Sequence, residues 1–451
     1  MRKIPVIRPA VARNLVAQVW TRLVSNVGVR LLQVPLLLST LGQDGYGRWL
    51  VISIIPAWLT LLNMGVGTVS GSSLVMEVAS GNLNNARKTY ANAMSLTLHI
   101  IAISMPLLSV VIFIFPEFLL KGMADSLRTE ATLGLLFLCI AVLVTFISDI
   151  HATRLRAAGK ANVAAFLLGG QLWLELGLIL VAINISTGLH WLGAANLIST
   201  MLYALATWVL SRIMLPDIRY VPTLSDRRGR LSLLKKGGIY QSFPVGHAIM
   251  LQGQILVVHQ TMGAGSVAVF STARTLVRLI SQGLEMVNHA VWPEMSRLFG
   301  LHDLKAAARL HRTAVLSAFF LSIVGAFLLW LFGPWLYAMW TRHMMVIDQQ
   351  LMIPLLIAIP VGSIWYTSSM VALSCNRYEG LAKRFLMASA VAHFFCWWLS
   401  LVFGLPGTAL SILIADAIMI PYVFKQSLKL TSDNQPGLIN RFISDIRNRQ
   451  T

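Results

Sequence analysis

The sequence predicts an all-α integral membrane protein with twelve transmembrane helices in two six-helix bundles. Three observations support this prediction: the composition, the number of long apolar segments, and the distribution of lysine and arginine. Of the 451 residues, 56% are hydrophobic and only 12% are charged. A soluble globular chain carries about 25% charged residues. The composition therefore indicates a chain that is embedded in a lipid bilayer.

Twelve segments are long and apolar enough to cross a bilayer. Its hydrocarbon core of about 30 Å is spanned by roughly 20 apolar residues in a helix. Short connectors such as 184–191 and 261–266 allow only tight hairpins between antiparallel neighbours. The expected spans are 14–38, 46–74, 91–115, 130–150, 161–184, 190–213, 238–261, 266–292, 313–338, 349–374, 382–404 and 406–427.

Lysine and arginine determine the expected orientation. If the N-terminus is cytoplasmic, 28 basic residues fall on the cytoplasmic side and 3 on the other, while 5 lie within or at the edge of spans. Cytoplasmic loops of membrane proteins carry such an excess. We therefore expect both termini in the cytoplasm. The basic cytoplasmic loops also explain the net charge of +19. Because no nucleic-acid-binding motif is present, we expect no nucleic-acid partner.

The sequence lacks the motifs of metal sites, nucleotide-binding sites and cleavable signal peptides. The three cysteines form no CxxC or Cys/His cluster, so we expect no metal, disulfide or cofactor. There is no GxxxxGK[ST] motif and no soluble domain large enough for an ATPase, so transport would have to use an ion or substrate gradient. The basic N-terminus leads into a long first span without a small-residue cleavage site, so we expect no cleavable signal peptide.

The two halves of the chain resemble each other weakly. Residues 40–49 align with 261–270 and residues 82–88 with 303–309, both at a shift of 221. A looser pair, 155–162 and 373–380, aligns at a shift nearer 218. Six helices per half is an even number, so both halves enter from the same face and form parallel, pseudo-twofold repeats. The expected domains are an N-terminal bundle, a basic cytoplasmic linker, a C-terminal bundle and a cytoplasmic tail, at 1–213, 214–237, 238–430 and 431–451.

Polar side chains interrupt the first span at a nearly constant step of four. A step of four on a helix of 3.6 residues per turn drifts by only about 40°, so these side chains share one face. An arginine that meets lipid at the bilayer centre costs about 3 to more than 10 kcal/mol. The face must therefore meet water or a partner. Its residues are Asn14, Gln18, Arg22, Asn26, Arg30 and Gln33.

The eighth span has a second polar face of the same kind. It consists of Arg274, Arg278, Gln282, Glu285 and His289. Because arginine suits phosphate and carboxylate groups, the two faces predict an anion-binding site. The candidate substrate-binding residues are Arg22, Asn26, Arg30, Arg48, Arg274, Arg278, Gln282 and Glu285.

Structural roles are the alternative for several of these residues. Arg22 can snorkel to the interface or pair with a carboxylate, and Arg48 can be an interface anchor. Arg278 and Glu285 are two turns apart, roughly 10 Å, and too far to pair directly. The sequence identifies no partner for two other carboxylates within spans, Glu175 and Asp416.

Four motifs, in this order and spacing, resemble those of the polysaccharide flippases of the MOP exporter superfamily, the Wzx-type, O-antigen-transporter-like proteins. They are Gly45–Trp49, Gly65–Gly67, Asn82–Lys88 and Pro293–Ser296, and the similarity spans the whole chain. Arg48 departs from the pattern, since the family often has a smaller or apolar residue there.

The resemblance implies a MATE-like, V-shaped, two-bundle transporter that works by alternating access. In relatives, helices 1, 2, 7 and 8 line a central cleft, which would bring the two polar faces together. The implied substrate is an undecaprenyl-diphosphate-linked oligosaccharide, flipped from the inner to the outer leaflet of the bacterial inner membrane for surface polysaccharide biosynthesis. Arg22, Arg30, Arg274 and Arg278 would then stabilise the diphosphate. The lipid bilayer, a polysaccharide polymerase and chain-length proteins are candidate partners, and H⁺ or Na⁺ is a candidate coupling ion.

Two other classes of function compete with this one. A MATE-like ion-coupled antiporter of small amphipathic compounds needs acidic residues in its cleft, and the first span has none. A membrane glycosyltransferase or polymerase needs large periplasmic loops, whereas the longest outer loop here, 116–130, has about 15 residues. We therefore expect a transporter and not an enzyme.

Overall fold

The computed structural model is helical throughout the residues that it describes, apart from turns and short connectors, and these residues form no strand. The described residues are 16–17, 20–119, 125–186, 188–375, 377 and 379–433. The predicted all-α fold class is thereby confirmed. The chain divides into two compact units, Met1–Gln241 and Ser242–Thr451, here called unit 1 and unit 2.

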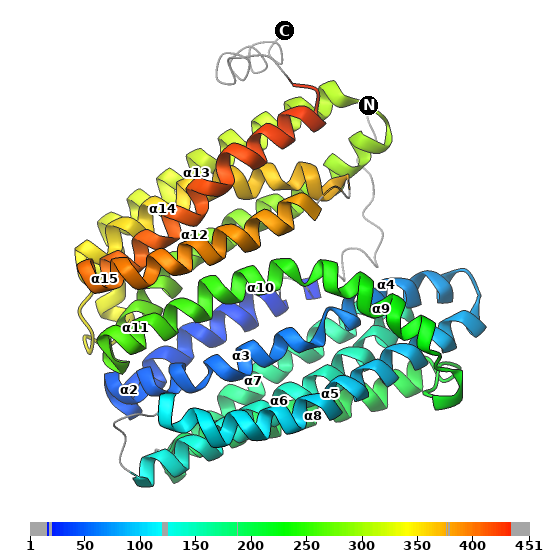
Figure 1. Ribbon diagram of the computed structural model, residues 1–451, viewed down its shortest axis with the longest axis horizontal. Coiled ribbons are helices and arrows are strands. Elements are labelled where there is room, and N and C mark those ends of the chain that lie inside the picture. Colours follow the sequence, from blue (N-terminus) through cyan, green and yellow to red (C-terminus); the bar gives the residue numbers. More distant parts are fainter. Residues whose placement is uncertain are drawn as a thin grey trace. The chain divides into compact units, whose positions relative to one another are not determined.

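Unit 1 is a bundle of long helices (Figure 1). Helix α6 lies at its centre and contacts α4, α5, α7 and α8. The elements in chain order are η1 (Trp20–Val27), α2 (Gly28–Ile52), α3 (Ile54–Leu59), η2 (Thr60–Asn63), α4 (Val66–Ala79), α5 (Leu83–Leu119), α6 (Asp125–Ala157), α7 (Ala161–Ile185), α8 (Leu189–Met214), η3 (Pro222–Leu224) and α9 (Arg227–Tyr240).

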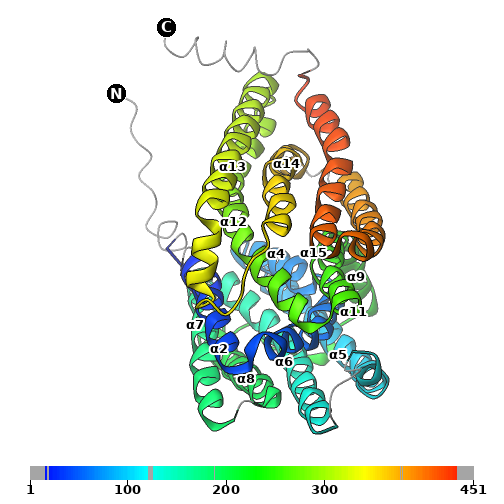
Figure 2. The same cartoon turned by 90° about the vertical axis from the view of Figure 1, so that its left-hand side faces the viewer.

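Unit 2 is also built from packed helices (Figure 2), which form fewer separate elements among the described residues. Helix α14 contacts α12, α13 and α15. The elements are α10 (Ser242–Ala248), η4 (Ile249–Gly253), α11 (Gln254–Met262), α12 (Ala264–Gly300), α13 (Leu304–Trp340), α14 (Gln349–Ser374) and α15 (Glu379–Leu430).

Among the described residues, eight helical segments are long and apolar enough to cross a membrane. Two of them, Gly28–Ala79 and Glu379–Leu430, have 52 residues each. At 1.5 Å per residue such a segment would be roughly 78 Å long, more than twice the hydrocarbon core. Each is interrupted by a glycine with non-helical geometry, Gly42 or Gly404. The chain is a multi-pass membrane protein, and the count of twelve spans stays a prediction.

Gly42 and Gly263 are separated by the predicted repeat distance and share one backbone conformation. Gly42 has φ 68° and ψ 179°, and Gly263 has φ 83° and ψ 177°. This region of backbone space is essentially restricted to glycine. Each glycine ends the first helical stretch of its unit, which supports the internal repeat.

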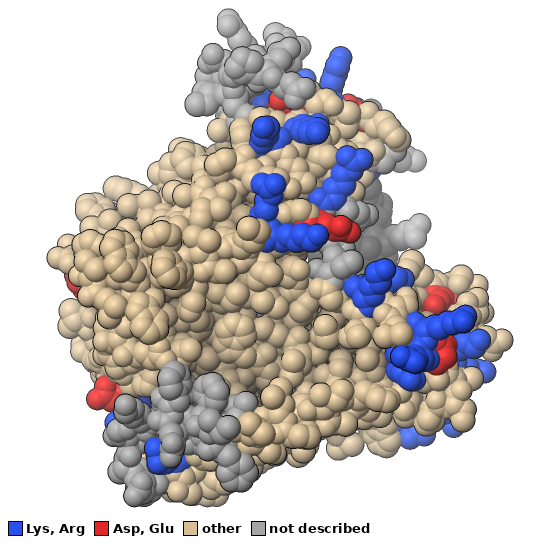
Figure 3. Space-filling model, viewed as in Figure 1, with Lys and Arg blue, Asp and Glu red and all other residues tan. Residues whose placement is uncertain are grey.

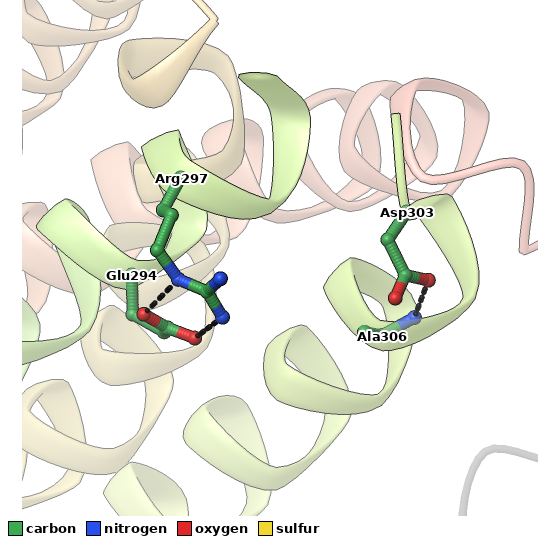
Figure 4. A network of polar contacts seen from close by, with 4 residues as sticks. All are labelled: Glu294, Arg297, Asp303 and Ala306. Atoms are coloured by element: carbon green, nitrogen blue, oxygen red, sulfur yellow. Dashed lines mark hydrogen bonds and ion pairs between the residues drawn. The ribbon is translucent and has the colours of Figure 1, made fainter. Parts of the chain in front are cut away.

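Two helix caps occupy equivalent positions at the same shift. In unit 1, the Asn82 side chain accepts a hydrogen bond of 3.2 Å from the Asn85 amide. In unit 2, the Asp303 side chain accepts one of 2.9 Å from the Ala306 amide, shown in Figure 4. Such caps satisfy main-chain N–H groups that a helix start leaves without a partner.

Two buried side-chain contacts follow the same repeat. The Tyr90 hydroxyl lies 3.0 Å from Nδ1 of His151 and joins α5 to α6. His311, which is 221 positions after Tyr90, places Nε2 3.1 Å from the Ser368 hydroxyl and joins α13 to α14. The equivalent helices of the two units are therefore joined at equivalent points.

The second helical segment of unit 1 breaks in its middle. Met64 (φ 48°) and Gly65 (φ 62°) both have left-handed backbone geometry. Helix α9 covers this break: Gly237 packs directly on the Met64 carbonyl, and Nε2 of Gln241 donates to the Leu61 carbonyl over 2.8 Å. Because a larger residue at 237 would strike main-chain atoms, the glycine allows α9 to lie this close.

Lysine and arginine gather near helix ends on the face drawn in Figure 3. In unit 2 they lie near the ends of α13 and α15, and in unit 1 near α9. The long sides of the helices on this face are almost free of charge. Such a surface suits helices that contact lipid along their length.

Candidate functional site

A cavity of about 240 Å³ lies within unit 2. Residues of α10, α12, α14 and α15 form its wall, together with Leu251 of η4. Much of the wall is apolar, and a small set of charged and polar side chains converges on it. This combination is typical of a ligand site. The histidine, charged and amide side chains of the wall are His247, Arg274, Arg278, Glu285, Asn288 and Asp416.

Arg274 is held by its own unit. Its Nη1 donates to the Leu251 carbonyl over 3.1 Å and to Oε1 of Gln254 over 3.3 Å. Its guanidinium lies 5.2 Å from the centre of the Phe270 ring. Leu251 belongs to the π-helix η4, whose widened turn differs from the α-helical hydrogen-bond pattern and here exposes a carbonyl to a side chain. These contacts give Arg274 a structural role, whatever else it binds.

Arg278 differs from Arg274 although it lies one turn further along α12. It makes no hydrogen bond or ion pair with any residue that the structure describes, and it is partly exposed. Glu285 lies seven residues further along, a rise of roughly 10 Å. Glu285 also has no such partner within the described part of the chain. Both charges are therefore available to a ligand.

Asp416 is the second carboxylate of the cavity, and its position is fixed by α14. Nε1 of Trp365 donates to its Oδ1 over 2.8 Å. A Cβ atom at Gly362 would lie 3.1 Å from Oδ2. The absence of a side chain at Gly362 lets α14 approach the carboxylate closely. The sequence identified no partner for Asp416, because this partner lies 51 positions away.

Asn288 was not among the residues predicted from the sequence. It is only 2% exposed and lines the cavity, and neither its Oδ1 nor its Nδ2 has a hydrogen-bond partner among the described residues. Its position, three residues after Glu285, would have placed it on the polar face. The predicted polar face ended instead at His289, four residues after Glu285. The side chain of His289 lies outside the described residues.

In unit 1, the polar face of the first helical stretch is described only in part. The side chains of Arg22 and Asn26 lie outside the described residues, although their backbone belongs to η1. Arg30 is exposed and interacts electrostatically with Glu175 of α7. Glu175 also accepts a hydrogen bond of 2.9 Å from Nδ2 of Asn196. Arg30 and Glu175 thus form a charged pair between α2 and α7.

The remaining two candidates are not among the residues of the cavity wall. Arg48 is partly exposed in α2 of unit 1. Gln282 lies in α12 of unit 2, where its buried Oε1 has no hydrogen-bond partner in the described part of the chain. The structure therefore brings Arg274, Arg278 and Glu285 together at one cavity. The substrate-binding role of all eight candidates stays a prediction.

Unit 1 also contains a half-buried acidic contact that was not predicted from the sequence. Asp149 of α6 accepts a hydrogen bond of 3.3 Å from Nδ2 of Asn63, next to the break at Met64, and interacts electrostatically with Arg156.

Within the described residues, no three His, Cys, Asp or Glu side chains lie close enough together to form a metal site.

Comparison with known proteins agrees with the resemblance found in the motifs. No family model matches the chain. The chain is 24% identical over 317 residues to a Salmonella typhi protein named "Putative O-antigen transporter", which covers 66% of this chain and 68% of that protein.

Solved structures show the fold. An inward-facing multidrug-resistance MATE family transporter of the MOP superfamily aligns with a TM-score of 0.74, at 16% identity over 95% of this chain and 100% of that one. A MOP superfamily transporter from Pyrococcus furiosus, described as having a binding pocket of reverse polarity that suggests a different function, aligns with a TM-score of 0.66 at 16% identity, over 94% of this chain and 95% of that one. The chain has the fold of MOP-superfamily transporters, and the resemblance to O-antigen transporters is confirmed by the curated relative.

Proposed function

We propose that the protein flips an undecaprenyl-diphosphate-linked oligosaccharide from the inner to the outer leaflet of the bacterial inner membrane. It does so by alternating access through a cationic cleft, and it serves surface polysaccharide biosynthesis. The observation that carries the proposal is the match of two thirds of the chain to a relative named as an O-antigen transporter. The fold of MOP-superfamily transporters supports it.

The arginines of the polar faces supply the chemistry. A diphosphate carries several negative charges, which charge-assisted hydrogen bonds from guanidinium groups stabilise well. Arg278 has no partner in the described part of the chain and is available for such bonds. Arg30 is exposed, and the nearby Glu175 lowers the cost of keeping its charge at membrane depth.

Charge reversal tests the proposal. In a strain that depends on this protein for its surface polysaccharide, Arg30→Glu and Arg278→Glu are expected to abolish the polysaccharide while the protein stays inserted in the membrane. Lys305→Glu is the matched control, because Lys305 is an exposed residue at the start of α13. Normal surface polysaccharide in both arginine variants contradicts the cationic cleft.

The orientation is part of the proposal. With both termini in the cytoplasm, a thiol introduced by Ser186→Cys is expected to react with a membrane-impermeant reagent in intact cells. A thiol introduced by Arg228→Cys is expected to react only after the cells are opened. Both positions are exposed, so accessibility within the protein does not account for a difference. The reverse labelling pattern overturns the orientation.

A second function, a MATE-like ion-coupled antiporter of small amphipathic compounds, is favoured by one observation. Glu285 and Asp416 both line the cavity of unit 2, and carboxylates suit cationic compounds. Under this alternative, the protein lowers the accumulation of an amphipathic cationic dye in cells, and Asp416→Asn abolishes the effect. Under the flippase proposal, deletion of the gene removes surface polysaccharide and leaves dye accumulation unchanged.

A further inference from the structure

The cavity of unit 2 has the size of a single ring. Its volume is about 240 Å³, whereas pockets for drug-sized ligands have about 300–1,000 Å³. An oligosaccharide or a long prenyl chain is too large for it. One sugar residue, or a group of similar size, fits this volume.

The formal charges of the cavity wall cancel. Arg274 and Arg278 carry two positive charges, and Glu285 and Asp416 carry two negative ones. Arg274 is already bound to Leu251 and Gln254, which leaves Arg278 as the arginine available to a ligand. A fully buried anion would therefore face two carboxylates, and like charges at close range cost several kcal/mol.

The charges are also separated along α12. Arg274 and Arg278 lie in one part of the helix, and Glu285 and Asn288 follow roughly 10–15 Å further along. One part of the cavity wall thus suits an anionic group. The other part, with carboxylate and amide groups, suits a ligand that donates and accepts hydrogen bonds without a negative charge.

Asn288 supplies the observation that points to a ligand in this second part. A buried amide without hydrogen bonds is unfavourable, because it has lost its water and gained nothing in return. Asn288 leaves both of its polar atoms without a partner among the described residues. Its amide offers one acceptor and two donor hydrogens. A hydroxylated ring satisfies both kinds of group at once.

The aromatic side chains of the wall fit the same kind of ligand. Trp365 and Tyr366 both line the cavity, with ring centroids 5.9 Å apart in an edge-on arrangement. Aromatic rings give an apolar surface beside polar groups. A sugar presents the same combination, with C–H groups on the faces of its ring and hydroxyl groups at its edge.

We infer that the part of this cavity formed by Glu285 and Asn288 is a binding subsite for one uncharged sugar residue. The inference rests on the proposed function, because it places the sugar of the lipid-linked substrate beyond a diphosphate held near Arg278. The Glu285 carboxylate accepts hydrogen bonds from hydroxyl groups, and the Asn288 amide makes two more. The same carboxylate disfavours a sugar that carries a carboxylate of its own.

Protection of an introduced thiol tests the subsite directly. Ser281 lines the cavity, and the full-length chain with Ser281→Cys is treated with a methanethiosulfonate reagent, with the unsubstituted chain as the blank for native cysteines. The probes are methyl glycosides of neutral hexoses and N-acetylhexosamines. We expect at least one of them to slow modification at least threefold. Failure of every probe in this panel to protect overturns the inference.

Two variants establish where the probe binds. Asn288→Ala is expected to weaken protection about tenfold, since two hydrogen bonds contribute roughly 1.4 kcal/mol or more together. Asn184→Ala, at an exposed position of α7 in unit 1, is the matched control and is expected to leave protection unchanged. Equal protection in Asn288→Ala and the control overturns the assignment to this cavity.

The ratio of the affinities for a neutral and an acidic glycoside is a further test. A folding defect would weaken the binding of both glycosides and would not by itself change this ratio. The unsubstituted cavity wall is expected to bind the methyl glucoside at least tenfold more tightly than the methyl glucuronide, which has the same ring with one added carboxylate. Glu285→Gln removes one like charge and is expected to reduce this preference severalfold. Equal binding of the two glycosides before the change overturns the inference.

The outcomes separate the subsite from the proposed function. If deletion removes surface polysaccharide but no glycoside protects the thiol, the flippase stands and the subsite fails. If glycosides protect the thiol but deletion leaves surface polysaccharide normal, the sugar subsite stands and the flippase proposal fails.

Discussion

Unit 1 and unit 2 each carry arginines on a polar face with a step of four, and they hold them differently. In unit 1, Arg30 is exposed and interacts with Glu175 of another helix. In unit 2, Arg274 donates to a main-chain carbonyl and to Gln254, while Arg278 has no partner in the described residues. The helical period therefore identifies which face is polar. Only the packing of neighbouring helices decides which arginine has a structural role and which is free for a ligand.

The largest expected effect separates the two arginines of unit 2. Arg274→Ala removes the side-chain hydrogen bonds to the Leu251 carbonyl and to the Gln254 amide oxygen, and is expected to lower the free energy of unfolding by about 2 kcal/mol. Arg278→Ala is its matched control and is expected to cost less than about 1 kcal/mol. Thermal unfolding of the purified protein in detergent measures both. Equal losses contradict the different roles assigned to the two arginines.

The hydrogen-bonded carboxylates Asp416 and Glu175, one in each unit, are expected to respond alike to substitution. Asp416→Ala leaves the Trp365 N–H unpaired, and Glu175→Ala does the same to the Asn196 amide; each is expected to cost about 1–2 kcal/mol. Asp416→Asn and Glu175→Gln keep a carbonyl acceptor and are expected to restore most of the loss in the same unfolding measurement. If the amide variants unfold as early as the alanine variants, hydrogen bonding is not what these carboxylates contribute.

A double-mutant cycle compares the electrostatics of the two units. Arg30→Gln and Glu175→Gln in unit 1 are expected to couple by about 0.5 kcal/mol, because the Arg30 side chain is exposed and water screens the pair. Arg278→Gln and Glu285→Gln in unit 2 are expected to couple by less, because roughly 10 Å of helix separates them. A coupling in unit 2 that equals or exceeds that of unit 1 would show that Arg278 and Glu285 interact after all.

The smallest expected effect concerns a helix cap outside the membrane-spanning segments. The Gly229 amide donates to Oδ1 of Asp226 and holds the pKa of this carboxyl below its ordinary value of 3.8. A lowered folded-state pKa stabilises the folded form above the unfolded-state pKa, and this contribution is lost as pH falls through the folded-state value. The cap of α9 is thus complete at neutral pH and weakens below about pH 4.

Hydrogen exchange of the α9 amides measures this effect, with Asp226→Asn as the reference at each pH, because asparagine also caps a helix and does not titrate. The two proteins are expected to exchange alike near pH 7. Below about pH 4 the unsubstituted protein is expected to exchange severalfold faster. An unchanged ratio across this range would mean that the charge of Asp226 does not matter for α9.

The sequence predicted the fold more fully than the site. Long apolar runs predicted the helices. The alignment at a shift of 221 pairs Gly42 with Gly263, which share one backbone conformation. The boundary expected at 405 lies next to the distorted Gly404. Helical period placed Arg278 and Glu285 on one face. These predictions follow from local sequence patterns or from the alignment of the two halves of the chain.

The remaining features depend on contacts between residues distant in sequence. The pairing of Trp365 with Asp416 and of Asn196 with Glu175 requires neighbouring helices to be placed. The π turn that exposes the Leu251 carbonyl has no residue signature in this chain. Asn288 lay within the polar face but differed from an ordinary polar residue only once its burial was known.

The backbone geometry of Gly42 and Gly263 determines which chirality of amino acid each position can accept. A Cβ atom built at either position meets no other atom within 4 Å, so neither glycine is required for space. What excludes other residues is the backbone geometry, which is the mirror image of the extended conformation that L-residues prefer. A D-alanine introduced at either position by chemical synthesis should therefore be accepted where L-alanine is not. At Gly42 and Gly263, one in each unit, the backbone geometry therefore restricts the chirality of the residue and not its size.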